Sequence, residues 1–403
     1  MTERVVVIGR NYTSRLGMIR AVGMAGYEVI VIKTNGTSEG KDIDAYSKYV
    51  KEYLYAREPD REGLLKVLVS LKRVNSKTVI IPVDDYAAST IDENIELLKA
   101  DFLFPNINMK QGAINCLMDK YYQKQLARKA GLNVAEGWVV NIEHHQYSLP
   151  NDVEYPIFPK PQISFKGDKK CMRQCNNEAE LRFVLDEVAR QRDCPMLLEK
   201  YIEIDKEYGV LGFCSRDRII TPGLIEKKFI GVGGHKGVTK VGLVTPLMEK
   251  EDLHRKIHRF LKLIGFTGLC DIDLYEHKGQ LYFNELNLRF GAFGYSIFCA
   301  GINMPKLLVD HLLNKPFGEV SGDIRARTVC ISEKVNFDDY FCGYYGKDEY
   351  NRIDNISPYS FIRCKEDPLP YQVFLSQNFS IKKQLEREKR RIKQKVRNLI
   401  IRN

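Results

Sequence analysis

The N-terminal part of the chain alternates short apolar strands with helical segments, and this alternation restricts the fold more than any other feature. Residues 4–9 and 27–32 read as strands that flank a helix at 16–25, and a strand at 78–82 follows a helix at 64–71. Such alternation is typical of a parallel sheet with right-handed crossovers, in which ligands bind beyond the carboxyl ends of the strands. The sequence therefore predicts an α/β opening.

Two turns of this predicted sheet bear on its ligand. Residues 9–17 lack the G-x-G-x-x-G pattern, which argues against a dinucleotide site there. Asp84 and Asp85 stand where the strand at 78–82 turns into the next helix. They are expected either to position an amino substrate or to cap that helix, and both roles stay open.

A second unit of strands and helices follows. A helix at 120–130 is expected to end at Gly131, and a polar loop containing prolines is expected at 147–156. The other predicted elements are strands at 138–140, 157–160, 196–199 and 208–213 and a helix at 181–190. Residues 231–237 are the most glycine-rich stretch of the chain and are expected to form a mobile loop.

The positive charge of the chain is concentrated at its end. The formal net charge is +10, and residues 381–403 carry ten Lys or Arg but two Glu, so that segment alone accounts for +8. The rest of the chain is close to neutral, and any partner rich in negative charge is expected at the tail.

The sequence also predicts a cytoplasmic protein. Its apolar runs are shorter than the roughly 18–20 residues of a membrane-spanning helix, and the run at 5–8 is too short for a signal peptide. The ten cysteines form no CxxC motif, and free thiols are expected in a reducing compartment.

Residues 268–291 carry the chemistry of the chain. Two alternating strands joined by a five-residue connection at 276–280 predict an antiparallel hairpin. Side chains alternate with period two, so each strand is expected to present one polar face. The faces are Asp271, Asp273 and Tyr275 on the first strand, and Phe283, Glu285, Asn287 and Arg289 on the second.

If the two faces coincide, Asp273, Glu285 and Asn287 form a cluster of oxygen ligands with Arg289 beside it. Oxygen ligands of this kind suit Mg²⁺, which keeps several waters and bridges substrate phosphates. The alternative is a solvated polar face without a function.

Other residues favour the metal site. Lys120 follows an Asp at a helix start, Lys160 ends an apolar strand, and Glu199 to Ile202 precede Glu207. In this order the motifs resemble the ATP-grasp superfamily, which includes biotin carboxylase, D-alanine–D-alanine ligase and carbamoyl phosphate synthetase. The resemblance covers roughly residues 1–330. The blocks at 266–273 and 284–289 and the basic tail are similar to D-aspartate ligase-like carboxylate–amine ligases.

The resemblance implies a mixed α/β and α+β chain with the ATP-grasp fold. It would begin with a Rossmann-like, pre-ATP-grasp parallel-sheet domain at 1–112. An ATP-grasp domain at 113–335 would follow, with an ATP-binding subdomain at about 140–203. A C-terminal extension at 336–380 and a basic amphipathic helix at 381–403 would complete the chain.

The resemblance also assigns the ligand contacts. Lys120 and Lys160 would hold the phosphates of ATP, and Glu207 the ribose. The main chain of Glu199, Lys200, Tyr201 and Ile202 would meet the adenine edge. Asp273, Glu285 and Asn287 would bind Mg²⁺, and Arg289 would stabilise the transferring phosphoryl group.

Two loops complete the implied site. Many ATP-grasp proteins have a glycine-rich phosphate lid after the second lysine, whereas this chain offers Ser164, Lys166 and Gly167. His235 and Lys236 of the glycine-rich loop would cover a reactive intermediate and exclude water, or would lie in a flexible surface loop.

The implied activity is an ATP-dependent carboxylate–amine ligase that forms an amide through an acyl phosphate, with a role in cell-envelope or capsule precursor synthesis. Its substrates would be a small or lipid-linked carboxylate and an amine such as an amino acid, and a homodimer is compatible with it. The alternatives are an ATP-grasp carboxylase or phosphotransferase, and a protein that binds a nucleotide without turnover.

The basic tail is the last predicted feature. Five of its apolar residues fall on one stripe of a helix, interrupted by Glu388, and these are Ile381, Leu385, Ile392, Val396 and Leu399. Such a helix suits an anionic membrane surface and would place the protein at the inner face of the membrane. Packing on the protein's own body and an RNA-binding arm are the alternatives, and nucleic acid is otherwise not an expected partner.

Overall fold

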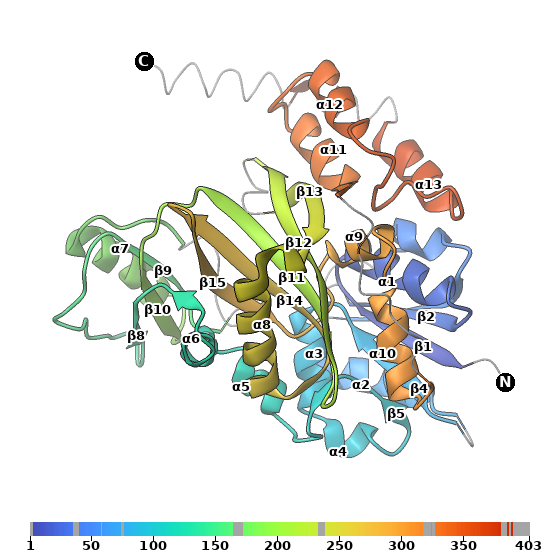
Figure 1. Ribbon diagram of the computed structural model, residues 1–403, viewed down its shortest axis with the longest axis horizontal. Helices are drawn as coiled ribbons and strands as arrows, with labels where there is room; N and C mark the ends of the chain where they lie inside the picture. Colours follow the sequence, from blue (N-terminus) through green and yellow to red (C-terminus); the bar gives the residue numbers. More distant parts are fainter. Residues whose placement is uncertain are drawn as a thin grey trace.

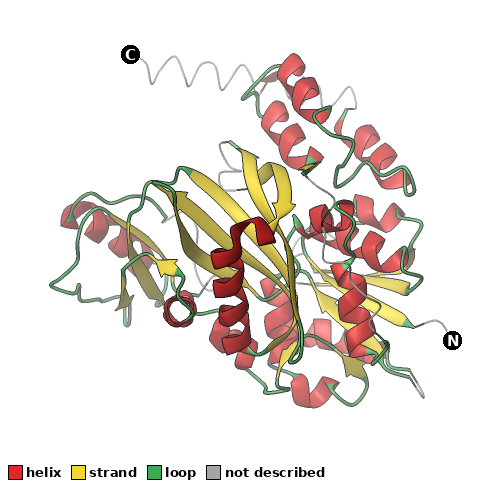
Figure 2. Cartoon of the chain, viewed as in Figure 1, coloured by secondary structure: helices red, strands yellow, loops and turns green. Residues whose placement is uncertain are grey.

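A computed structural model describes residues 3–34, 40–57, 59–73, 76–163, 172–232, 238–316, 324, 327–379, 385, 386, 388 and 389. Within these residues the chain forms a five-stranded, a three-stranded and an eight-stranded sheet. Figure 1 shows the eight-stranded sheet in the centre, with the three-stranded sheet on one side and the five-stranded sheet on the other. Figure 2 shows that helices flank each of them.

The five-stranded N-terminal sheet is parallel throughout, as the sequence predicts. Its strand order is β3-β2-β1-β4-β5. The strands are β1 (Arg4–Gly9), β2 (Glu28–Thr34), β3 (Val50–Ala56), β4 (Thr78–Pro82) and β5 (Phe102–Leu103). The connecting helices are α1 (Tyr12–Gly23), η1 (Ile43–Tyr46), α2 (Arg61–Ser70), α3 (Asp85–Asp92) and α4 (Ile95–Leu98). Strand β4 is buried along its whole length, which explains its continuous apolar sequence.

The three-stranded sheet is antiparallel, with β10 in the middle. It consists of β8 (Gly137–Asn141), β9 (Ile157–Pro161) and β10 (Pro195–Lys200), and α7 (Glu178–Ala189) covers it. The predicted loop at 147–156 contains no helix or strand in the structure. The predicted elements at 138–140, 157–160, 181–190 and 196–199 are all confirmed, with small shifts at their ends.

The eight-stranded sheet is the central body of the chain. Its strands are β6 (Asn106–Ile107), β7 (Asn133–Val134), β11 (Lys206–Cys214), β12 (Ile219–Ile230), β13 (Thr239–Pro246), β14 (Phe266–His277), β15 (Gln280–Asn287) and β16 (Thr328–Ile331). Its helices are α5 (Ala113–Leu117), α6 (Lys120–Lys129), η5 (Leu247–Lys250) and α8 (Glu251–Ile264). Helix α8 packs its apolar side on β14 and β15, for example through Phe260 against Phe283.

The connection between β14 and β15 is shorter than predicted. The strands continue to His277 and from Gln280, so the turn consists of Lys278 and Gly279 instead of five residues. Both turn residues have positive φ, 49° and 76°. Two consecutive residues with positive φ are typical of a type I′ hairpin turn, which favours glycine at the second position.

The part of the chain after β15 packs against the N-terminal sheet. Its helices are α9 (Gly294–Cys299), α10 (Met304–Leu312), α11 (Glu333–Phe341), α12 (Lys347–Asp354) and α13 (Leu369–Asn378). Residues 332–379, which include α11 to α13, are called the extension below, and the predicted start of the extension at residue 336 falls inside α11. Figure 1 shows α11 to α13 above α1, and an apolar cluster joins Leu16 of α1 to Phe337 and Phe374. The predicted domain boundaries and the basic helix at 381–403 stay predictions, and most of that tail lies outside the described residues. In the described part of the chain, no helix is both long and apolar enough to cross a membrane.

Candidate active site

The β14–β15 hairpin brings the predicted oxygen ligands together. Asp273 lies opposite Glu285, and Asp271 lies opposite Asn287. The two polar faces therefore coincide, as the period-two pattern predicts. The three predicted metal ligands also line one cleft.

A β-bulge breaks the predicted alternation on β15. The register shifts after Asp273, so Leu274 pairs with Phe283 and Asn284 is the extra residue. Phe283 is buried in the core with Leu274, and the prediction that it shares a face with Glu285 is wrong. The bulge lets the side chains of Asn284 and Glu285 both face the cleft.

The cleft lies where the three-stranded sheet meets the eight-stranded sheet and encloses about 360 Å³. It gathers ten of the predicted residues, which are Lys120, Lys160, Glu199, Lys200, Tyr201, Ile202, Asp273, Glu285, Asn287 and Arg289. These residues come from segments more than 160 positions apart in the sequence. The fold therefore assembles most of the predicted site in one place.

Helix α6 positions the first lysine. Asp119 caps the helix by accepting hydrogen bonds from the N–H groups of Tyr121 and Tyr122, and it also accepts from Gln162 Nε2 at 2.6 Å. The N–H of Lys120 donates to the carbonyl of Gln162 at 3.0 Å. The helix ends at Gly131, whose φ is +89° as expected for the glycine after a helix.

Three lysines and two glutamates form a charged cluster at the cleft, and all of them except the buried Lys124 line it. Lys160 Nζ lies 2.8 Å and Lys124 Nζ 2.9 Å from Glu199 Oε1, and Lys120 Nζ lies 3.4 Å from Glu285 Oε1. Burial lowers the pKa of Lys120, and it lowers that of Lys124 to about 8 against the opposing effect of Glu199. Burial opposes ionisation of Glu199, but Lys160 and Lys124 outweigh it and lower its pKa.

Sequence reasoning missed Lys124. It lies four residues after Lys120, on the same face of a helix, and this spacing was the available signal. It also missed Asn284, whose Oδ1 accepts a hydrogen bond from Lys160 Nζ at 3.1 Å.

Lys227 of β12 is a third missed residue and links two predicted contacts. Its Nζ lies 3.0 Å from Asp273 Oδ1 and 3.1 Å from Glu207 Oε2. Burial opposes its charge, but Asp273 and Glu207 together raise its pKa. Glu207 is not among the residues that line the cleft, so its ribose contact stays a prediction.

The two aspartates after β4 differ in their contacts, and only the capping role that the sequence left open is confirmed, for Asp84. Asp84 caps α3 by accepting from the N–H of Ala87 at 2.8 Å. Asp85 lines the cleft, and its Oδ1 accepts from Arg289 Nε at 2.9 Å. Burial opposes the charge of Arg289, but Asp85 and Asp271 raise its pKa.

The main chain after β10 has few donors left for an adenine edge. The N–H of Lys200 donates to the carbonyl of Glu136, and that of Tyr201 donates to the carbonyl of Pro156. Among the described residues, Ile202 N–H has no such partner. The predicted adenine contact of this segment stays a prediction.

The donor set at the hairpin fits Mg²⁺. Asp273 and Glu285 supply carboxylates, and Asn287 supplies an amide oxygen, which at present accepts from Arg289 at 3.2 Å. In the described part of the chain, no group of three or more His, Cys, Asp or Glu side chains is arranged to hold a metal alone. Two carboxylates and an amide suit an ion that keeps waters and phosphate oxygens in its shell.

Asp271 stands beside this set. Burial and the neighbouring Asp273 raise its pKa to about 7. Five further predicted contacts, Ser164, Lys166, Gly167, His235 and Lys236, lie outside the described residues.

Comparisons with known proteins agree with this geometry. No family model matches the chain. The carbamoyl phosphate synthase large chain of Vibrio cholerae is 22% identical over 269 residues, which is 66% of this chain and 24% of that protein. That of Gemmatimonas aurantiaca is 20% identical over 334 residues, 79% of this chain and 29% of that protein. The chain spans about a quarter of the length of these curated relatives.

Solved structures match a larger share of the chain. Biotin carboxylase from Campylobacter jejuni, solved with β-γ-ATP, has a TM-score of 0.61 at 17% identity and covers 81% of this chain and 74% of its own. An L-amino acid ligase from Bacillus licheniformis has a TM-score of 0.58 at 15% identity, covering 81% and 78%. N5-carboxyaminoimidazole synthetase from Staphylococcus aureus, complexed with ADP, has a TM-score of 0.60 at 18% identity, covering 82% of each chain. The predicted resemblance to ATP-grasp proteins is confirmed, and the chain has the ATP-grasp fold. The similarity to D-aspartate ligase-like enzymes stays a prediction.

Proposed function

We propose that this chain is an ATP-dependent carboxylate–amine ligase that forms an amide bond through an acyl phosphate. The observation that carries the proposal is the convergence of Lys120 and Lys160 with Asp273, Glu285 and Asn287 in one cleft. Among the described residues that line it there is no serine, threonine or cysteine to act as a nucleophile. A site of cations and oxygen donors suits phosphoryl transfer, where catalysis is positioning and charge neutralisation.

In the first step a carboxylate oxygen of the substrate attacks the γ-phosphorus of ATP. The bond between that phosphorus and the β–γ bridging oxygen breaks, and ADP leaves. Lys120 and Lys160 would hold phosphate oxygens as point charges. Arg289, kept in place by Asp85 at 2.9 Å, would stabilise the charge on the transferring group.

In the second step an amine attacks the carbonyl carbon of the acyl phosphate. The carbon–oxygen bond to phosphate breaks, phosphate leaves, and the nitrogen gives up a proton to yield the amide. The chain needs no covalent nucleophile for either step. Its task is to align the reactants and exclude water.

Asp273, Glu285 and Asn287 would hold Mg²⁺, which, when bound, neutralises phosphate charge. Ile202 N–H would bind the adenine edge and Glu207 the ribose. Ser164, Lys166 and Gly167 would contact the phosphates, and His235 and Lys236 would cover the intermediate. These last five assignments rest on the sequence alone.

A carboxylase is the second candidate, because two of the similar structures are a biotin carboxylase and an N5-carboxyaminoimidazole synthetase. In that case bicarbonate takes the place of the organic carboxylate. A measurement of phosphate release from ATP, in the presence of Mg²⁺ and different substrates, separates the candidates. Release that depends on an amino acid supports the ligase, release that depends on bicarbonate supports the carboxylase, and nucleotide binding without release indicates a protein without turnover.

The setting of the reaction is also a proposal. We infer a cytoplasmic enzyme, active as a monomer or homodimer, whose tail from residue 381 binds an anionic membrane surface where lipid-linked precursors lie. The support is the charge of +8 in that segment. The full chain should sediment with anionic vesicles at low salt, and a chain truncated after Ser380 should not. Equal binding to neutral vesicles contradicts the proposal.

A further inference from the structure

A second cavity of about 340 Å³ adjoins the nucleotide cleft and shares Asp273 with it. This volume is at the lower end of the range of about 300–1,000 Å³ for small-molecule sites. Its wall is built from three distant parts of the chain. Three pairs of polar residues carry the argument. They are Asn11 and Thr13 at the start of α1, Lys227 and Asp271 from the eight-stranded sheet, and Lys334 and Asp338 from α11.

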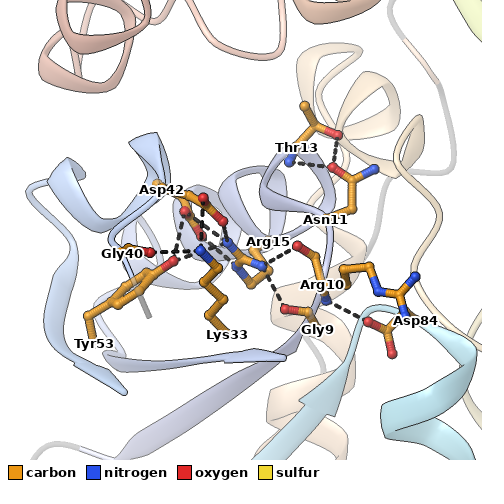
Figure 3. Close-up of polar contacts among 11 residues, drawn as sticks. Gly9, Arg10, Asn11, Thr13, Arg15, Lys33, Gly40, Asp42, Tyr53 and Asp84 are labelled. Atoms are coloured by element: carbon orange, nitrogen blue, oxygen red, sulfur yellow. Dashed lines mark hydrogen bonds and ion pairs between the residues drawn. The ribbon is translucent and has the colours of Figure 1, made fainter. Parts of the chain in front are cut away.

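The N-terminal side of this cavity is held firmly. Arg15 donates to the carbonyls of Gly9 and Arg10 at 2.6 and 2.7 Å, and the N–H of Arg10 donates to Asp84 at 2.6 Å (Figure 3). Asn11 follows directly and caps α1 by accepting from the N–H of Thr13 at 3.0 Å. The turn that carries the cavity-lining side chain of Asn11 is therefore fixed from two sides.

The extension side is held equally firmly. Glu333 is buried at the start of α11 and accepts hydrogen bonds from the N–H groups of Phe361, Ile362 and Arg363. Arg20 of α1 donates to the carbonyls of Phe361 and Ile362, both at 2.8 Å. These bonds attach the extension to the N-terminal sheet, so the cavity exists before any ligand arrives.

The wall of the cavity carries charges of both signs beside apolar surface. Asp271 forms no ion pair with any described residue, and Lys334 is paired only with Asp338 within α11, where both side chains are partly exposed. Ile225, Phe293 and Val335 supply the apolar part. A small ligand with an ammonium group, a carboxylate and an apolar portion matches this wall.

We infer that this cavity binds the amine substrate as a free α-amino acid, and that Lys334 of the extension recognises its carboxylate. The inference rests on the proposed function, because it gives that ligase its amine site. The shared Asp273 puts the amino acid next to the metal-binding hairpin, where the acyl phosphate would form. The extension thereby takes part in choosing the substrate.

Lys334→Met in the full chain tests the inference, with phosphate release measured at saturating ATP and Mg²⁺ in the presence of a pool of small carboxylic acids without an amino group, which supply the oxygen that accepts the phosphoryl group. The probes are the free L-amino acids and, for each active one, the amine that lacks its carboxylate. K334M should raise the half-saturating concentration of the amino acid about tenfold or more and leave that of ATP unchanged. K334R should retain most of the affinity.

Lys256→Met is the matched control. Lys256 also pairs with an aspartate on its own helix, Asp252 at 2.6 Å, and its side chain is 33% exposed against 36% for Lys334. K256M should have the same half-saturating concentrations of the amino acid and of ATP as the wild type. If K334M has a lower melting temperature than the wild type, Ala292→Leu provides the second variant, because it fills the same cavity without a change of charge. A292L should raise the half-saturating concentration of the amino acid and leave that of ATP unchanged.

The outcomes separate the two proposals. Wild-type release that no amino acid stimulates overturns the ligase and, with it, this assignment. Amino-acid-dependent release with unchanged half-saturation in K334M and A292L overturns the assignment alone. Equal stimulation by the amine without a carboxylate also overturns the role of Lys334.

Discussion

Two regions of this protein bury charged side chains, and they use them differently. In α1, which lies between the N-terminal sheet and the extension, Arg15 and Arg20 are fully buried. Arg15 donates to two main-chain carbonyls and to Asp42, Asp44 and Tyr53 (Figure 3). In the cleft of the candidate active site, by contrast, Lys120 makes a contact of 3.4 Å with Glu285, whose side chain is 22% exposed.

The contrast separates charges that support the fold from charges that support a reaction. Each guanidinium donates its hydrogen bonds to carboxylates and carbonyls inside the protein and is fully buried, so it is not available to bind a ligand. The cleft lysines and carboxylates converge instead on open volume, where a phosphate or a cation can compete for them. We therefore expect substitutions in the first group to change stability and those in the second to change binding or turnover.

Arg20→Met should have the largest effect, and on stability. It removes the cation from a buried pair, 2.9 Å from Asp367, and frees carbonyls of the extension. Breaking a buried pair in this way costs about 3–5 kcal/mol. Urea denaturation measures the loss. Arg4→Met is the control, because its pair with Glu28 is partly exposed and is worth about 1 kcal/mol or less. Equal losses of unfolding free energy in R20M and R4M would contradict the structural role assigned to the buried Arg20.

Glu285→Ala should reduce turnover about 10²–10³-fold, the range for loss of one electrostatic contact to a transferring group. Its midpoint of urea denaturation should stay close to that of the wild type, since Glu285 is partly exposed in the cleft. The dependence of the rate on Mg²⁺ concentration is the second readout, because a lost ligand should raise the concentration required. Activity within a few-fold of the wild type would contradict the assignment of Glu285 as a metal ligand.

The sequence predicted those parts of the molecule that depend on short-range patterns. Strand β4 was predicted with its observed bounds, because a continuous apolar run needs no distant partner to be recognised. Asp273 and Glu285 were placed on facing strands because period-two alternation and a glycine turn define a hairpin. The bulge at Asn284 has no comparable signal, so the same alternation misplaced Phe283.

The missed features depend on contacts between distant segments. Lys227 contacts Asp273, a predicted metal ligand, from β12, a strand for which no prediction was made. The extension is held by Arg20 through carbonyls 341 and 342 positions away in the sequence. Nothing local to Arg20 distinguishes it from an exposed arginine, and its partners become visible only in the folded chain.

Lys160→Ala should weaken ATP binding about tenfold, an effect smaller than that of E285A on turnover. Lys160 lies in the cleft with its side chain 6% exposed, and a charged hydrogen bond of this kind is worth roughly 1.5–3 kcal/mol. Lys124 is also paired with Glu199, so that glutamate keeps one cationic partner in the variant. This remaining pair limits the loss of ATP affinity. Calorimetric titration with ATP measures the change, and an unchanged affinity would place Lys160 among the structural charges.

Lys200→Ala should have the smallest effect, although Lys200 lines the same cleft. Its side chain is 42% exposed and pairs with Glu154, which is itself 61% exposed, so water screens its charge. The predicted adenine contact of this segment is made by the main chain, which alanine preserves. ATP affinity should therefore stay within about twofold of the wild type, as for other exposed pairs. A tenfold loss in the same titration would bring Lys200 into the phosphate-binding group, and the contrast between K160A and K200A would disappear.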